Sequence, residues 1–146
     1  MPQSFGSNTP SVLAKADFAN VATAAIDASH TLPQMLIDVC KRQGQRPAFT
    51  NLGRTLNYAE IEQKSADLAA YLRNGLGLNP GDRVAIMLPN LLQYPIAVLG
   101  VQRADLIAVL VNPLYTPREL RHQLADSGAV VLIVLDNFGQ VAAESL

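Results

Sequence analysis

The sequence is poor in several residue types that mark particular classes of protein. It has one cysteine, Cys40, no tryptophan, and only 5% aromatic residues among its 146 residues. A single cysteine excludes an internal disulfide and is typical of proteins in a reducing compartment. Charged residues make up 16% of the chain and hydrophobic residues 49%. This balance excludes overall disorder and predicts a globular core.

The sequence also lacks a dominant charge and a long apolar run. Its formal net charge is −1 and its lysines and arginines form no cluster, so nothing predicts a nucleic-acid interface. Arg103 and Asp105 interrupt the longest apolar stretch, which therefore falls short of the roughly 18 residues of a membrane helix. Residues 1–30 hold no apolar segment typical of an export signal. We expect a soluble cytoplasmic chain, with peripheral contact at the inner face of the membrane left open.

No segment matches a common nucleotide-binding or hydrolase motif. GLGLNPG, residues 75–81, has one residue too many for a dinucleotide loop and precedes a strand, so we interpret it as a helix end and turn. Neither a GxxxxGK[ST] loop nor a GxSxG elbow occurs in the sequence. His30 and His122 do not make a metal site with Cys40 unless several distant carboxylates join them.

Three apolar runs indicate a parallel sheet. They cover residues 84–88, 106–111 and 130–135 and do not alternate polar with apolar residues, so both faces of each strand are expected to be covered. The intervening segments 91–104 and 117–127 are long enough for crossover helices. This order predicts an α/β fold, a partial parallel sheet of the βαβαβ type with flanking helices and right-handed crossovers.

Two shorter elements are predicted ahead of the sheet. Thr31 supplies an N-cap hydroxyl for a helix, and Gly44 is placed to end that helix in the left-handed conformation. Residues 47–57, PAFTNLGRTLN, predict a short hairpin with Gly53 in its turn. Residues 1–30 have weak periodicity and are expected to form a weakly ordered N-terminal arm.

Capping residues mark two further helices. Asn57 is followed by Glu60 at the third helical position, which is the pattern of a capping box. The same pattern recurs at Thr116 and Glu119, and Gly128 is placed to close that second helix. Both patterns are explained by folding alone and require no chemistry.

The start of the helix that contains Pro95 is left open by the sequence. A helix that begins at Asn90 would carry Pro95 at its fifth residue and lose one hydrogen bond, whereas a helix that begins near Tyr94 would not. Asp136 is interpreted as the cap of a final short helix. Alone it cannot form the carboxylate cluster of a receiver-domain magnesium site.

Tyr94, Asn112 and Tyr115 fall at strand ends or helix starts, where doubly wound sheets bind ligands. For each of them a structural role also explains its presence. We therefore predict no catalytic, cofactor-binding or metal-ligating residue in this chain.

Two segments carry a resemblance to a known family. Residues 81–104, GDRVAIMLPNLLQYPIAVLGVQRA, and 111–129, VNPLYTPRELRHQLADSGA, resemble the N-terminal part of bacterial long-chain fatty-acid–CoA ligases, which belong to the adenylate-forming (AMP-binding) superfamily. The resemblance implies that residues 31–146 form an incomplete N-terminal subdomain, the first part of the large domain. Asp105 stands where the family usually has glycine, and it should be unfavourable if the position needs a positive φ.

The resemblance also implies a reaction for a complete enzyme. Such ligases use ATP, Mg²⁺ and coenzyme A to convert a fatty acid, through an acyl-adenylate and diphosphate, to acyl-CoA and AMP. The family's phosphate loop, its Tyr-Gly-x-Thr-Glu motif, its ribose-binding aspartate and its C-terminal lysine have no counterpart in this sequence. We expect the chain alone to be inactive, to hold no cofactor or fatty acid itself, and to have the remainder of a ligase chain as its partner.

Two other interpretations stay open, a free-standing non-catalytic α/β binding or interaction module and a receiver-like nucleotide-binding domain. For a partial sheet we also expect an uncovered edge or apolar face. Such a surface, or the arm at residues 1–30, predicts self-association.

Overall fold

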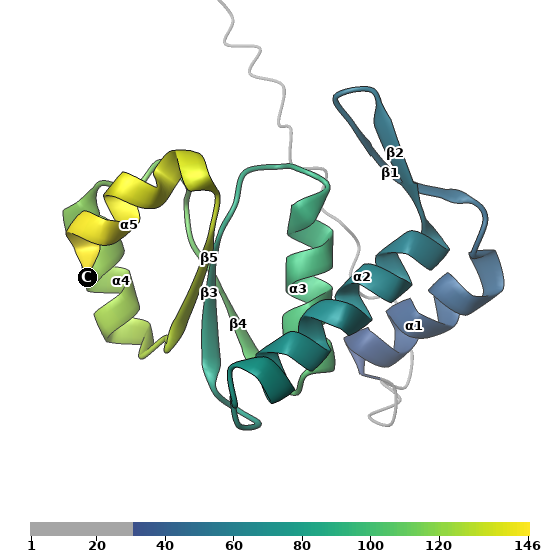
Figure 1. Ribbon diagram of the computed structural model, residues 1–146, viewed down its shortest axis with the longest axis horizontal. Coiled ribbons are helices and arrows are strands. Elements are labelled where there is room, and N and C mark those ends of the chain that lie inside the picture. The colour runs from purple at the N-terminus through teal and green to yellow at the C-terminus, as the bar shows by residue number, and fades with distance from the viewer. Residues whose placement is uncertain (1–30) are drawn as a thin grey trace, which may run out of the picture. The chain divides into compact units, whose positions relative to one another are not determined.

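The computed structural model describes residues 31–146, and the arm predicted for residues 1–30 lies outside the described residues. The elements follow the chain in this order: α1 (Leu32–Gln43), β1 (Pro47–Asn51), β2 (Arg54–Asn57), α2 (Tyr58–Ala70), the π-helix η2 (Tyr71–Gly75), β3 (Arg83–Met87), α3 (Gln93–Arg103), β4 (Ile107–Leu110), α4 (Pro117–Ser127), β5 (Val131–Val134), the 3₁₀-helix η3 (Asp136–Phe138) and α5 (Gly139–Ser145). Figure 1 shows their arrangement.

The sheet is parallel and has the strand order β4-β3-β5, and β1 and β2 form a separate antiparallel hairpin. The predicted α/β class and the βαβαβ unit are therefore confirmed. In Figure 1, α3 lies on one side of the sheet and α4 and α5 lie on the other. The chain enters the sheet at its central strand, β3, and crosses to β4 through α3. It then crosses back past β3 to β5 through α4, which makes the unit doubly wound.

The central strand β3 holds the two sides of the core together. Val84 and Ile86 pack with α2 and α3, whereas Ala85 and Met87 pack with α4 and α5. All four side chains are 0% exposed. The alternation follows the two-residue period of a strand, so this one strand supplies side chains to two separate apolar layers.

The edge strands are less covered than the sequence predicts. In β4, Ile107 is 46% exposed and Leu110 is 55% exposed, and all residues of β5 are half-buried. The expectation of two covered faces holds for β3 and is wrong for β4 and β5. Continuous apolar runs predict burial for all three strands alike, but only the central strand has a neighbour on each side within the part of the chain that the structure describes.

Helices α2 and α3 pack closely because of one glycine. A Cβ atom at Gly100 would come within 2.8 Å of the Leu68 side chain, so any larger residue there would push the helices apart. The predicted capping box starts α2: the Asn57 side chain accepts the Glu60 N–H, and the Glu60 carboxylate accepts the Asn57 N–H. Beneath this cap, Leu56 and Ile61 are buried in a second apolar cluster, with α1 and α3.

The segment between β4 and β5 folds as its sequence predicts. Thr116 and Glu119 form a complete capping box at the start of α4, and Pro117 occupies the first helical turn. Leu120, on the first turn, is 0% exposed. Gly128 has a φ of 65°, the left-handed conformation in which glycine closes a helix.

Two predicted helix boundaries are wrong. Gly44 follows α1 in the right-handed conformation, with φ −33°, and not in the left-handed one. Asp136 caps no helix with its side chain; it is the first residue of η3, whose N-cap position is taken by Leu135. In both places the chain turns by backbone hydrogen bonds: Arg46 N–H donates to Gln43 C=O and Phe138 N–H donates to Leu135 C=O.

The structure decides the alternative at Pro95. Helix α3 begins at Gln93, so Pro95 is its third residue. The first four N–H groups of a helix have no partner within the helix, and the missing N–H of Pro95 therefore removes no hydrogen bond. None of the helices described here is long and apolar enough to cross a bilayer.

Two non-glycine residues adopt a positive φ in the described part of the chain, Leu52 at 48° and Asp105 at 57°. Leu52 precedes Gly53 in the hairpin turn, where asparagine or aspartate is common. Asp105 links α3 to β4, and its carbonyl accepts the Gly81 N–H at 2.8 Å. Asp105 was expected to be unfavourable if its position needs a positive φ, and the structure shows that it has one.

Replacement of Asp105 by glycine should stabilise the protein. The Asp105→Gly change relieves the left-handed conformation and leaves the carbonyl in place, so we expect the free energy of unfolding to rise by about 0.5–1 kcal/mol. Asp136→Gly is the matched control, because Asp136 has a right-handed backbone and should lose stability instead. Urea unfolding of both variants measures the difference. Equal losses in the two variants would contradict the strain at Asp105.

Candidate functional site

A crevice lies at the carboxyl ends of β3 and β4, where the two crossovers leave the sheet in opposite directions. Leu88, Pro89 and Asn90 line it from β3, and Val111 and Pro113 from β4, with Tyr94 of α3 beside them. Its volume is about 380 Å³. Ligands of doubly wound sheets bind at such a switch point, so its position is that of a binding site.

The structure separates the three residues that the sequence placed near strand ends. Tyr94 lines the crevice, whereas Tyr115 faces a different hollow on α4, with Glu119 and His122. The Asn112 side chain accepts the backbone N–H of Leu114 at 3.0 Å and so forms a turn within its own loop. Of the three, only Tyr94 therefore lines the crevice, whereas Asn112 has a partner in its own loop and Tyr115 packs against the apolar cluster that contains Leu120.

The crevice lacks the groups that acid–base or phosphate chemistry requires. Tyr94 is the one ionisable side chain among its lining residues, and no lysine, arginine, histidine or carboxylate lines it within residues 31–146. Asn90 contributes its backbone carbonyl to a 3.0 Å hydrogen bond from the Asn51 amide. The crevice can thus receive an apolar group, but the described residues that line it include no partner that would activate Tyr94 and no cation that would hold a phosphate.

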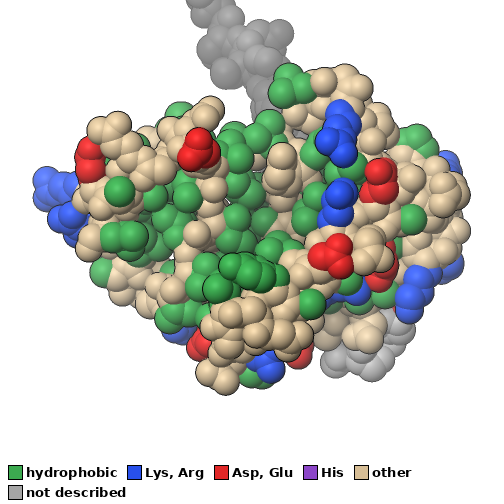
Figure 2. Space-filling model, in the orientation of Figure 1, with side chains coloured by type: hydrophobic (Ala, Val, Ile, Leu, Met, Phe, Trp, Pro, Cys, Tyr) green, Lys and Arg blue, Asp and Glu red, His purple; other side chains and the backbone are tan. Residues whose placement is uncertain are grey.

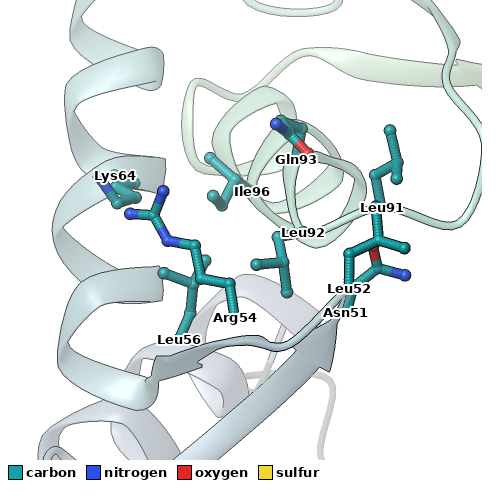
Figure 3. A pocket seen from close by; sticks show the side chains of 9 residues that line it. All are labelled: Asn51, Leu52, Arg54, Leu56, Lys64, Leu91, Leu92, Gln93 and Ile96. Carbon is teal, nitrogen blue, oxygen red and sulfur yellow. The ribbon is translucent and has the colours of Figure 1, made fainter.

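A second concave surface, here called the hairpin groove, lies between the β1–β2 hairpin, α2 and the start of α3. Figure 3 shows its lining residues, which are Asn51, Leu52, Arg54, Leu56, Lys64, Leu91, Leu92, Gln93 and Ile96. Its volume is about 430 Å³. It shares no lining residue with the strand-end crevice.

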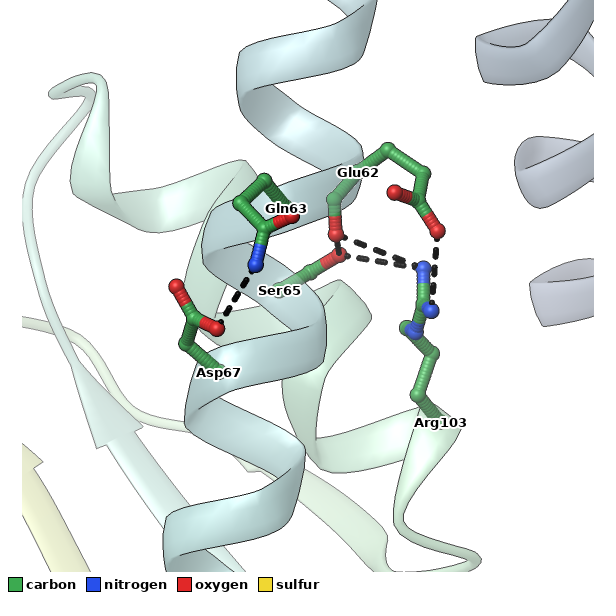
Figure 4. Close-up of polar contacts among 5 residues, drawn as sticks. All are labelled: Glu62, Gln63, Ser65, Asp67 and Arg103. Carbon is green, nitrogen blue, oxygen red and sulfur yellow. Dashed lines mark hydrogen bonds and ion pairs between the residues drawn. The ribbon is translucent and has the colours of Figure 1, made fainter.

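A polar network joins α2 to the end of α3 (Figure 4). The Arg103 guanidinium forms an ion pair with the Glu62 carboxylate at 3.1 Å and reaches the Ser65 hydroxyl at 3.5 Å. Ser65 is 0% exposed, and its hydroxyl donates to the Glu62 carbonyl. Every buried polar atom of this network has a partner, so its role is to fix two helices and not to react.

Cys40 packs in the apolar cluster under α1 and α2, and it is 4% exposed. Burial raises the pKa of its thiol, the nearby Glu62 carboxylate raises it further, and Arg103 lowers it. A raised pKa keeps the thiol protonated and unreactive at neutral pH. Cys40 is therefore a core residue and not a nucleophile.

Residues 31–146 contain no group of three or more histidine, cysteine, aspartate or glutamate side chains placed to hold a metal ion. His122 lines two surface hollows on α4 beside Glu119. His30, the other histidine considered from the sequence, lies outside the described residues.

Residues 36–146 match the protein family described as AMP-binding enzyme. Among curated proteins, the long-chain-fatty-acid–CoA ligase of Yersinia pestis is 54% identical over 112 residues, which is 77% of this chain and 20% of that protein. The ligase of the same name from Haemophilus influenzae is 60% identical over 93 residues, 64% of this chain and 16% of that protein. The chain thus spans about a fifth of the length of these relatives.

The fold also matches solved structures. A benzoate CoA ligase from Burkholderia xenovorans LB400 superposes with a TM-score of 0.74 and 24% identity, over 77% of this chain and 23% of that one. An identity this low shows the fold alone. The resemblance of the sequence to the N-terminal part of bacterial long-chain fatty-acid–CoA ligases is confirmed by the sequence comparisons.

Removal of Arg103 should weaken the contact between α2 and α3. Arg103→Gln leaves the partly buried Glu62 carboxylate without its cation, so we expect the free energy of unfolding to fall by about 1 kcal/mol. Arg118→Gln is the matched control on the exposed face of α4 and should change stability by less than about 0.5 kcal/mol. Urea unfolding at low and high salt measures both effects. The network has no stabilising role if the two variants unfold alike.

Proposed function

This chain belongs to the AMP-binding enzyme family, and we propose that it supplies the N-terminal section of an ATP-dependent long-chain fatty-acid–CoA ligase. The observation that carries this proposal is its similarity, across most of residues 31–146, to bacterial ligases of that name. The complete reaction would join a fatty acid to coenzyme A through an acyl-adenylate, with release of diphosphate and then AMP.

The described residues that line the strand-end crevice do not fit a nucleotide and its magnesium ion. Phosphate groups need cations or converging backbone N–H groups, and Mg²⁺ needs carboxylate oxygens. The strand-end crevice offers Tyr94, two prolines and apolar side chains. We therefore assign no step of the reaction to residues 31–146 and propose a scaffold role, in which this βαβαβ unit supports the parts of a ligase that bind ATP and coenzyme A. A cytoplasmic location stays a prediction from the sequence.

A chimaeric enzyme tests the proposal. The chain is joined to the Yersinia pestis ligase in place of the segment that it matches, and palmitoyl-CoA formation is measured. We expect the chimaera to be active and the 146-residue chain alone to release no diphosphate from ATP with palmitate and coenzyme A. A folded chimaera without activity, or turnover by the isolated chain, would refute the scaffold role.

Two variants of the chimaera test whether activity requires this segment to be folded. Ala85→Asp places a carboxylate at a position of β3 that is 0% exposed and should abolish activity together with folding. Arg118→Gln, on the exposed face of α4, should leave activity unchanged.

We further propose that the isolated chain self-associates through the outer edge of β5, which pairs with no other strand among residues 31–146. The Val130 N–H donates to Arg83 of β3, so in the parallel ladder the backbone groups of Val131 and Ile133 point away from β3. Figure 2 shows hydrophobic side chains gathered over the middle of this face, where Figure 1 places the sheet. By contrast, the Gln123 side chain donates to the Leu110 carbonyl and covers part of the β4 edge. An uncharged, unpaired strand edge is a template for a second copy.

A lysine beside β5 should prevent this association. Val130 directly precedes the strand and is 61% exposed, so Val130→Lys adds an edge charge without disturbing the core. We expect sedimentation velocity to show concentration-dependent dimers for the natural chain and monomers for Val130→Lys. Leu76→Lys, at a residue that is 43% exposed and outside the sheet, should still dimerise. A monomeric natural chain at the highest concentration tested would overturn the proposal.

A further inference from the structure

The outer edge of β5 carries backbone groups that no strand within the described part of the chain pairs with. The Val130 N–H donates to the Arg83 carbonyl, just before β3 and β5 run side by side, at 2.9 Å. Successive residues of a parallel strand direct their backbone groups to alternate sides, so Val131 and Ile133 point theirs away from β3. The sheet of residues 31–146 ends at β5 on that side. The edge therefore presents a short row of donors and acceptors to a further strand.

The two edges of the sheet are not alike. At the β4 edge, the Gln123 side chain donates to the Leu110 carbonyl at 3.1 Å, so the chain itself occupies an outward acceptor there. The residues of β5 are all apolar and half-buried, and none is a charged residue or a proline of the kind that protects a natural edge. Apolar strands of parallel sheets are typically covered on both faces. Strand β5 thus has the composition of an inner strand and the position of an edge strand.

The two crossovers of the sheet have the same hand. Helix α3 lies on one side of the sheet and leads from β3 to β4, whereas α4 lies on the other side and leads in the opposite direction, past β3 to β5 (Figure 1). Reversal of both the side and the direction leaves the hand of a crossover unchanged. Because about 98% of parallel βαβ units are right-handed, this hand predicts the course of a further crossover.

Helix α5 lies on the same side of the sheet as α4. Leu120 of α4 and Val141 of α5 belong to one apolar cluster. The Arg121 guanidinium of α4 donates to the Glu144 and Ser145 carbonyls at 2.6 and 3.0 Å, which ties the end of α5 to α4. A crossover that keeps its hand on this side must lead the way α4 leads, and from β5 that direction is outward, beyond the edge of the sheet.

We propose that, in a complete ligase, the section of chain that follows α5 adds a strand parallel to β5 at its outer edge. This inference rests on the proposed function, in which the chain is the N-terminal section of a ligase about five times as long. The new strand makes β5 an inner strand, in agreement with its composition. Association of the isolated chain through β5 then substitutes for a contact that the complete ligase makes within one chain.

Hydrogen exchange at single-residue resolution tests the pairing in the folded chimaera with the Yersinia pestis ligase. The reference is the isolated chain at a concentration at which sedimentation shows monomers. We expect the Val131 and Ile133 amides to exchange about 100-fold more slowly in the chimaera, because a paired amide exchanges only when the structure opens. The Leu132 amide, which faces β3, is the internal control and should be protected in both proteins. Equal exchange of Val131 and Ile133 in the two proteins would overturn the proposal.

Two variants at Ile133 give a second measurement. Proline removes the outward N–H of this residue and no hydrogen bond to β3, whereas alanine shortens the side chain and keeps the N–H. The thermal midpoint of Ile133→Pro should lie below that of Ile133→Ala by a larger interval in the chimaera than in the isolated monomer. The same interval in both proteins contradicts a partner strand at this edge.

A crystal structure of the chimaera identifies the partner of β5 and its direction. We expect a parallel strand from the section that follows α5. An antiparallel strand, a segment from elsewhere in the ligase or a second copy at this edge would each refute the proposal. None of these measurements uses turnover, so the two proposals fail separately. A folded, inactive chimaera with protected amides refutes the scaffold role alone, and an active chimaera with unprotected amides refutes the strand alone.

Discussion

The burial of β3 on both faces is the constraint on which the rest of this structure depends. Val84, Ala85, Ile86 and Met87 have no exposed surface, so each face of the strand must be covered by a separate layer. A chain that leaves β3 through α3 covers one face, and its return through α4 covers the other. Because the first crossover ends beside β3 and the second passes over it, β3 becomes central and two edge strands result. The crevice at the carboxyl ends follows from this topology alone.

Strong local chemistry makes much of this fold predictable from the sequence. Capping boxes at Asn57 and Thr116 depend on side chains three residues apart, and the glycine at 128 meets a backbone requirement that few other residues meet. These features need no tertiary information. The three apolar runs were also sufficient to predict a parallel sheet, because strands that do not alternate are typical of sheets with helices on both sides.

The parts that could not be predicted depend on contacts distant in the sequence. An apolar run does not reveal whether its strand is central or at an edge, so the exposure of Ile107 and Leu110 followed only from the strand order. Gly44 and Asp136 look like helix-terminal residues, but backbone hydrogen bonds close both turns without a left-handed residue or a side-chain cap. The hairpin groove was missed because its cations, Arg54 and Lys64, are separated by a strand end and a helix turn.

Two residues with positive φ show how strain in the backbone can be interpreted. Asp105 sits in a tight connection whose carbonyl is hydrogen-bonded to Gly81, so the fold fixes its conformation and the side chain merely tolerates it. Leu52 has the same type of backbone, but its side chain packs on nothing in the core and is 91% exposed. Asparagine would suit that left-handed turn position better than leucine does. At Leu52 the hairpin turn therefore sets the left-handed backbone, just as the α3–β4 connection sets it at Asp105.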